Sequence, residues 1–154
     1  MLFLVFELAR DRYVLDVSRI AEVLPLLAIK QIPQAPPAVA GVLNYRGAPV
    51  PVIDLSQLTL GRPAERRLST RIVLVHYPDA RGGTQLLGLI AEKATHTVRR
   101  EETDFIASGV TSEGAAYLGP VAPDAHGLLQ WLDAGTLLPA SVRDMLFRQP
   151  KAEG

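Results

Sequence analysis

The chain contains no cysteine among its 154 residues. This excludes disulfide bonds, thiolate metal ligands and a cysteine nucleophile, and it suits a reducing compartment, so we expect a cytoplasmic protein. Net charge is also absent, because 16 Lys and Arg side chains balance 16 Asp and Glu side chains. A neutral chain has no general electrostatic attraction to nucleic acids or anionic lipids. We therefore expect no nucleic-acid partner.

Long hydrophobic runs and catalytic motifs are missing as well. No apolar run approaches the roughly 18 residues of a membrane span, so we expect no direct membrane insertion. The sequence has no phosphate-binding glycine loop, no nucleophile elbow and no HExxH helix. Its three histidines, at positions 76, 96 and 126, lie too far apart to read as a metal site. These absences predict a protein without metal, cofactor or catalytic residues.

What the chain does contain is a series of short apolar runs separated by glycine and proline, with 12 residues of each type. The runs are rich in Val, Ile and Leu, which favours strands over helices. We expect strands over 2–9 and 12–17, and a long hairpin formed by RIVLVHY and TQLLGLIAEKATHTV. The fold is thus predicted to be mainly β.

Two short helices are predicted among the strands. Asp54 and Gln57 resemble a capping box and Gly61 resembles a helix stop, which together predict a helix over Leu55 to Leu60. Near the C-terminus, PASVRDMLFR predicts a short helix with Val142, Met145 and Leu146 on one face.

The stretch GVLNYRGAPVPVIDL, residues 41 to 55, carries the most information. Alternation along a strand places Leu43 and Tyr45 on one face, which we expect to be core, and Asn44 and Arg46 on the other. Prolines at positions 49 and 51 remove two hydrogen-bond donors from one flank of the next strand. That flank should be an edge or a bulge, so a partner must use side chains there.

Arg46 on the non-core face requires an anion, and Glu22 is the candidate because it shares a face with Ile20 on a mostly apolar strand. Two interpretations are open. An exposed pair would contribute about 0–1 kcal/mol, whereas breaking a desolvated pair in a groove would cost about 3–5 kcal/mol. The glycines at 41 and 47 either let backbones approach closely or simply permit turns.

These stretches resemble the CheW-like domain family, the coupling module of bacterial chemosensory arrays. The resemblance covers nearly the whole chain and is most specific from Ala35 to Gly61, where GVLNYRG is followed by VPVIDL. It extends to EVL at 22–24, RIVLVHY, LLGLIAEKATHTV and GLLQWLDAGTLL. Tyr45 and Pro49 stand where the family more usually has aliphatic residues.

The resemblance implies one domain over residues 1–150 and a tail at 151–154. Within the domain it implies two small five-stranded SH3-like β-barrels packed side by side around a hydrophobic groove, with a few short helices. We expect the first barrel mostly at 12–70, and the second mostly at 71–136 together with the N-terminal strand. A groove that receives helical ridges should be apolar with little charge.

The resemblance also implies a non-catalytic adaptor. Such a protein holds the regulatory domain of a CheA-type histidine kinase against the cytoplasmic tip of a methyl-accepting chemoreceptor, and is recruited to membrane receptor arrays. The residues expected to bind these partners or to shape the groove are Ile20, Glu22, Gly41, Asn44, Arg46 and Gly47. The alternatives are a similar adaptor in a non-motility pathway, a small-ligand site in the groove, and a nucleic-acid-binding barrel.

Overall fold

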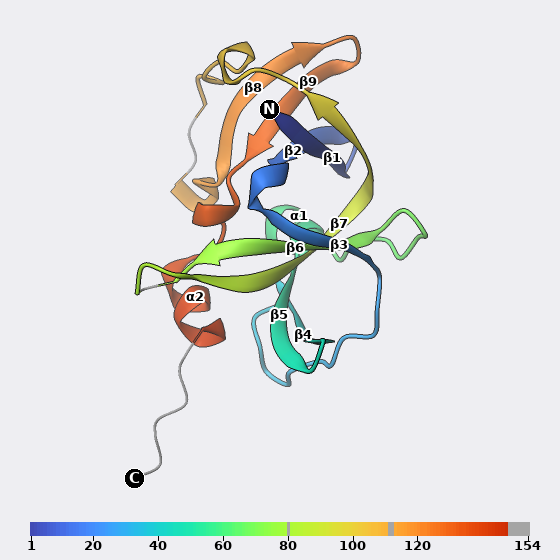
Figure 1. Ribbon diagram of the computed structural model, residues 1–154, viewed down its shortest axis with the longest axis vertical. Coiled ribbons are helices and arrows are strands. Elements are labelled where there is room, and N and C mark those ends of the chain that lie inside the picture. The colour runs from blue at the N-terminus through green and yellow to red at the C-terminus, as the bar shows by residue number, and fades with distance from the viewer. Residues whose placement is uncertain (80, 111–112, 148–154) are drawn as a thin grey trace.

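The computed structural model describes residues 1–79, 81–110 and 113–147, and it is mainly β, as predicted (Figure 1). The strands are β1 (Leu2–Leu8), β2 (Asp11–Asp16), β3 (Ile20–Pro25), β4 (Val39–Tyr45), β5 (Ala48–Asp54), β6 (Arg71–Pro78), β7 (Thr84–Arg99), β8 (Leu118–Asp124) and β9 (Gly127–Leu132). The α-helices are α1 (Leu55–Leu60) and α2 (Ala140–Leu146), and short 3-10 turns lie between strands. The predicted tail at 151–154 lies outside the described residues.

The strands form two subdomains of five strands each, with β7 shared between them. We define subdomain 1 as β3, β6, residues 84–91 of β7, β5 and β4, and subdomain 2 as residues 92–99 of β7, β1, β2, β9 and β8. Both are SH3-like. Within the described part of the chain the strand path stays open, from β3 and β4 at its two ends in subdomain 1 to β8 in subdomain 2, so neither subdomain is a closed barrel.

This pairing divides the chain differently from the predicted barrels at 12–70 and 71–136. Strand β2 lies in subdomain 2, because a tight turn keeps it antiparallel to β1. Strand β6 and the first half of β7 lie in subdomain 1, where they pair with β3 and β5. The predicted boundaries followed chain order, whereas the sheet joins strands that are far apart in sequence.

Strand β7 runs through both subdomains (Figure 1). Val5 of β1 pairs with His96, but Glu7 pairs with Glu92, so β7 carries two extra residues opposite β1 at this point. Lys93 within this bulge has φ 51°, and its Nζ lies 2.9 Å from Glu7 Oε2. A bulge bends its strand and increases the local twist. The bend lets one strand take part in both subdomains.

A shared core packs between the subdomains. On β1, Leu4, Phe6 and Leu8 face this shared core, while Phe3 and Val5 face the core of subdomain 2. Strands β6 and β7 alternate in the same way between the shared core and the core of subdomain 1. The buried residues of the shared core are Leu4, Phe6, Leu8, Tyr13, Leu15, Ile53, Leu55, Val73, Val75, Tyr77, Leu87, Leu89, Ala91, Ala94, Tyr117, Leu132, Ala134, Leu137 and Leu138.

The helices follow the sequence signals closely. Asp54 caps α1 by accepting hydrogen bonds from the backbone N–H groups of Ser56 and Gln57, at 3.0 and 3.2 Å, and the helix ends at Gly61. In α2, Val142 and Leu146 pack against the shared core. Met145 was predicted on the same face but is 50% exposed. The buried face of α2 is therefore narrower than the spacing of its apolar residues suggested.

The prolines of β5 lie on an open edge, as predicted. Lys30 and Val42 exchange two backbone hydrogen bonds, of 2.9 and 2.8 Å, so Val42 turns its polar groups away from its β5 partner Pro51. By alternation, the nitrogens of Pro49 and Pro51 then point away from β4. On the side of β5 that faces away from β4, β7 pairs with β5 only over residues 52–54. The stretch with the prolines therefore cannot accept a full added strand.

Candidate functional site

The β4–β5 hairpin ends in a two-residue turn formed by Arg46 and Gly47. Their φ angles are 52° and 85°, and positive values at both positions are typical of the tight turns that match strand twist. Asn44 Oδ1 accepts a hydrogen bond of 2.9 Å from the Gly47 backbone N–H, which fastens the turn. Two predicted site residues, Asn44 and Gly47, thus fix the loop that carries a third, Arg46.

Three side chains meet beside this turn, and we call them the Glu22–Tyr45–Arg46 cluster. Glu22 Oε2 on β3 lies 3.7 Å from Arg46 Nη2, so the predicted ion pair is present. The Tyr45 hydroxyl donates a hydrogen bond to the same Glu22 oxygen. The Arg46 guanidinium lies over the Tyr45 ring, with its carbon 5.0 Å from the ring centroid, which is within range of a cation–π contact.

The ion pair is exposed, which decides between the two interpretations in favour of the exposed pair. The Arg46 side chain is 76% exposed and that of Glu22 is 35% exposed. Water screens a pair of this kind, and its contribution to stability is about 0–1 kcal/mol. The pair alone is therefore a weak constraint on the shape of this surface.

Tyr45 connects the cluster to the interior. Its ring packs against the core of subdomain 1, on the face that alternation assigned to it with Leu43. The hydrogen bond to Glu22 raises the pKa of the Tyr45 phenol above its ordinary value, and partial burial raises that pKa further. The Arg46 charge lowers it and the Glu22 charge raises it, both more weakly. The neutral phenol is thus the form that the site stabilises.

Gly41 serves a close backbone approach, which decides between the two interpretations of the glycines. A Cβ built at Gly41 would lie 2.1 Å from the backbone oxygen of Lys30, and the residue has φ 143°. Gly47 has no atom within 4 Å of such a Cβ, so its requirement is the turn. Gly41 thus allows the segment around Lys30 to lie against β4.

Ile20 lies apart from the cluster. The β3–β6 register shifts between Ile20 and Glu22, and the half-buried Ile20 packs against the shared core. The simple alternation expected along this strand is therefore interrupted. The structure joins Glu22 to Arg46 and Asn44 to Gly47, but Ile20 and Gly41 hold the local shape of β3 and β4. Tyr45 was missed because its position in the strand indicated only core packing.

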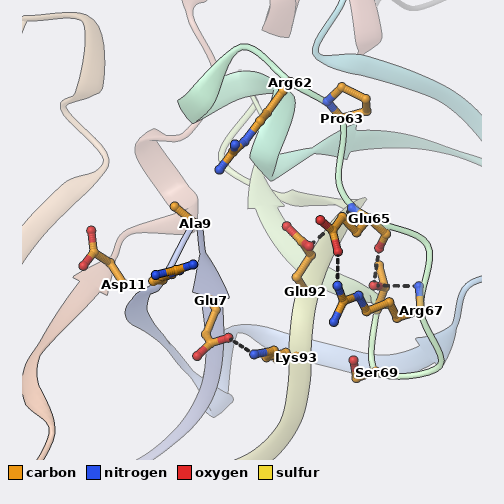
Figure 2. Close-up of a pocket in the computed structure, with 12 residues that line it drawn as sticks. Glu7, Ala9, Asp11, Arg62, Pro63, Glu65, Arg67, Ser69, Glu92 and Lys93 are labelled. Carbon is orange, nitrogen blue, oxygen red and sulfur yellow. Dashed lines mark hydrogen bonds and ion pairs between the residues drawn. The ribbon is translucent and has the colours of Figure 1, made fainter.

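One hollow between the subdomains is not apolar. The structure has a hollow of about 680 Å³ lined from both subdomains, and Figure 2 shows charged side chains around it. In its lining, Lys93 pairs with Glu7, and Arg67 Nη2 lies 2.5 Å from Glu65 Oε2. The apolar side chains between the subdomains are instead buried in the shared core. The expectation of an uncharged groove is therefore wrong for this hollow.

Residues 2–142 match the model of the CheW-like domain. The chain belongs to the CheW-like domain family. It is 26% identical over 137 residues to "Chemotaxis protein CheW" of Bacillus subtilis, a match that covers 88% of this chain and 85% of that one. It is also 29% identical over 104 residues to "Chemotaxis protein CheW" of Helicobacter pylori, covering 67% of this chain and 59% of the relative.

A solved CheW structure has the same fold. The scaffolding protein TtCheW of Thermoanaerobacter tengcongensis superposes with a TM-score of 0.81 at 26% identity, covering 94% of this chain and 92% of that one. CheW-like proteins are non-catalytic scaffolds and adaptors of chemotaxis signalling. Among the residues that the structure describes, no three acidic or histidine side chains are placed to hold a metal ion. No helix in that part of the chain is long and apolar enough to cross a membrane.

Replacing Gly41 by Ala should destabilise the fold by about 2–5 kcal/mol, because a clash with Lys30 adds to the cost of an unfavourable φ. The free energy of unfolding in urea measures this. Gly114→Ala is the control, since its Cβ would meet no atom of the described residues within 4 Å, and it should change stability by no more than about 0.5 kcal/mol. Equal effects of the two changes would contradict the close approach.

The Tyr45 pKa should fall in Glu22→Gln, because the carboxylate is the largest cause of its elevation. A raised phenol pKa means that the bond stabilises the fold below the ordinary phenol pKa of about 10, and that this contribution is lost as pH rises through the higher value. A titration of the tyrosine ring carbons by NMR measures the change. Tyr77, whose pKa is raised chiefly by burial, should stay unchanged in the same spectra. An unaltered Tyr45 titration would show that the hydrogen bond is absent.

Proposed function

We propose that this chain is a non-catalytic adaptor that couples chemoreceptors to a CheA-type histidine kinase. It would hold the regulatory domain of the kinase beside the cytoplasmic tip of a methyl-accepting chemoreceptor, in the cytoplasm and recruited to membrane receptor arrays. The match of residues 2–142 to the CheW-like domain is the observation that carries this proposal. The chemotaxis names of its bacterial relatives agree with it.

The architecture supports a function in binding. The shared core joins two subdomains into one body, so surfaces on the two subdomains keep a fixed relation to each other. An adaptor needs such a relation, because its output is the relative placement of its partners. The prolines of β5 discourage strand addition, which leaves side chains as the means of contact at that edge.

We assign the receptor contact to the surface around the β4–β5 turn. Arg46 projects from this turn, and Glu22 lies beside it on β3. Asn44, Gly47 and Gly41 fix the backbone there, and Ile20 anchors the start of β3 on the shared core. In this proposal the six residues predicted from the sequence divide into two that meet the receptor and four that shape the surface.

We assign the kinase contact to exposed apolar side chains at the outer parts of the subdomains. In subdomain 1, Leu27 and Ile32 are 42% and 44% exposed, in the segment between β3 and β4. In subdomain 2, Ile106 and Leu128 are 62% and 57% exposed. Large apolar side chains on a surface are suited to contacts with another folded domain.

Arg46→Ala should weaken binding of the receptor tip by about tenfold, because it removes the exposed N–H donors that the receptor tip would engage. Binding of the kinase regulatory domain should be unchanged. Calorimetric titration of the purified chain with each partner measures both. The control is Arg66→Ala, an exposed arginine in the loop after α1 that should leave both affinities intact.

Wild-type chain that binds neither partner would overturn the proposed function. Wild-type chain that binds both partners, with an unchanged affinity for the receptor tip in Arg46→Ala, would instead remove Arg46 from the contact.

A further inference from the structure

We infer that Tyr45 is the positioning residue of the receptor-binding surface, holding Glu22 and Arg46 in one fixed arrangement. The inference rests on the proposed function and adds to it a residue that supports the receptor contact without making it. Its starting point is that the two charges belong to strands that do not pair with each other.

Strands β3 and β4 are the two ends of the strand path in subdomain 1. Within the described residues, β3 pairs only with β6, and β4 pairs with β5 and forms a single bridge with Lys30. No backbone ladder therefore fixes the distance between Glu22 on β3 and the turn after β4. Side chains must set it, and the Glu22–Tyr45–Arg46 cluster spans this gap.

The ion pair alone is a poor means of fixing that distance. Glu22 and Arg46 are separated by 3.7 Å, both side chains are flexible, and the Arg46 side chain is largely exposed. Exposed pairs with this geometry gain little because ordering two long side chains offsets their attraction. An Arg46 that had to be ordered on binding would weaken the complex.

Tyr45 lowers this ordering cost because the core holds its own side chain in place. Its ring packs against the core of subdomain 1, and its backbone pairs with Ala48 at the end of the hairpin. From this position the hydroxyl binds one carboxylate oxygen of Glu22, in a hydrogen bond strengthened by the charge. The face of the ring supports the Arg46 guanidinium. One anchored side chain thus orders both charged groups.

The arrangement leaves Arg46 available to a partner. Its side chain makes an ion pair and a ring contact, but no hydrogen bond within the described chain. Its planar set of N–H donors can therefore be used by carboxylate or carbonyl oxygens of the receptor tip. Tyr45 itself need not touch the receptor, since its hydroxyl is already committed to Glu22.

Two substitutions separate the contributions of Tyr45. Tyr45→Phe removes the hydroxyl and keeps the ring, so binding of the receptor tip should weaken by about fivefold. Tyr45→Leu also removes the ring face, so binding should weaken by about tenfold or more. Affinity for the kinase regulatory domain should stay unchanged in both. Both affinities are measured by calorimetric titration of the full chain, with thermal unfolding recorded for each variant.

The matched control is Tyr117→Phe. Tyr117 also hydrogen-bonds through its hydroxyl, to Thr59 Oγ1 at 3.0 Å, but it lies in the shared core away from the cluster. Removing that hydroxyl should leave receptor affinity unchanged. A second readout is the exchange rate of the Arg46 side-chain N–H groups by NMR, which should rise in both Tyr45 variants and stay the same in Tyr117→Phe.

The outcomes distinguish the inference from the proposed function. If the wild-type chain binds the receptor tip and Tyr45→Phe binds it equally well, the positioning role is overturned while the adaptor function stands. Equal loss of both partners with a lowered unfolding temperature would show a general structural role and would also overturn the inference. Should Tyr45→Leu fail to fold, Tyr45→Phe still decides. A wild-type chain that binds no receptor tip would overturn the adaptor function itself.

Discussion

The two subdomains depend on one strand. β7 has 16 residues, and its two halves belong to different subdomains on either side of the bulge at Lys93. β1, β6 and the first half of β7 each pack against the shared core on one face and against a subdomain core on the other. Movement of one subdomain against the other would expose this core. The molecule is therefore suited to transmit position between partners.

The same arrangement leaves free edges, and the surface that we propose for receptor binding lies at one of them. Among the residues that the structure describes, subdomain 1 does not close, and no ladder joins its end strands β3 and β4. The Glu22–Tyr45–Arg46 cluster joins them through side chains. Charged side chains join the two strands at this open edge, where a continuous hydrogen-bond ladder would otherwise do so. In the proposed function, two of these residues, Glu22 and Arg46, also meet the receptor.

The sequence predicted the local features well because their causes are local. The cap at Asp54 and the edge created by Pro49 and Pro51 each follow from a few adjacent residues. The Glu22–Arg46 pair was also found, since an arginine between glycines on a polar face requires an anion. The subdomain boundaries were not found, because they depend on pairing between distant strands. The hydrogen bond from Tyr45 to Glu22 was missed. Alternation predicts the strand face on which a side chain lies, but it does not predict what the hydroxyl at the end of that side chain contacts.

The central claim is that this chain binds a receptor through the surface around β3 and the β4–β5 turn. The most direct test is an NMR titration of the isotope-labelled full chain with a soluble helical fragment of a chemoreceptor tip. The account predicts amide shifts that are concentrated in β3, the end of β4 and the start of β5, with the strands of subdomain 2 little changed. Shifts confined to subdomain 2, or none at saturating fragment, would contradict it.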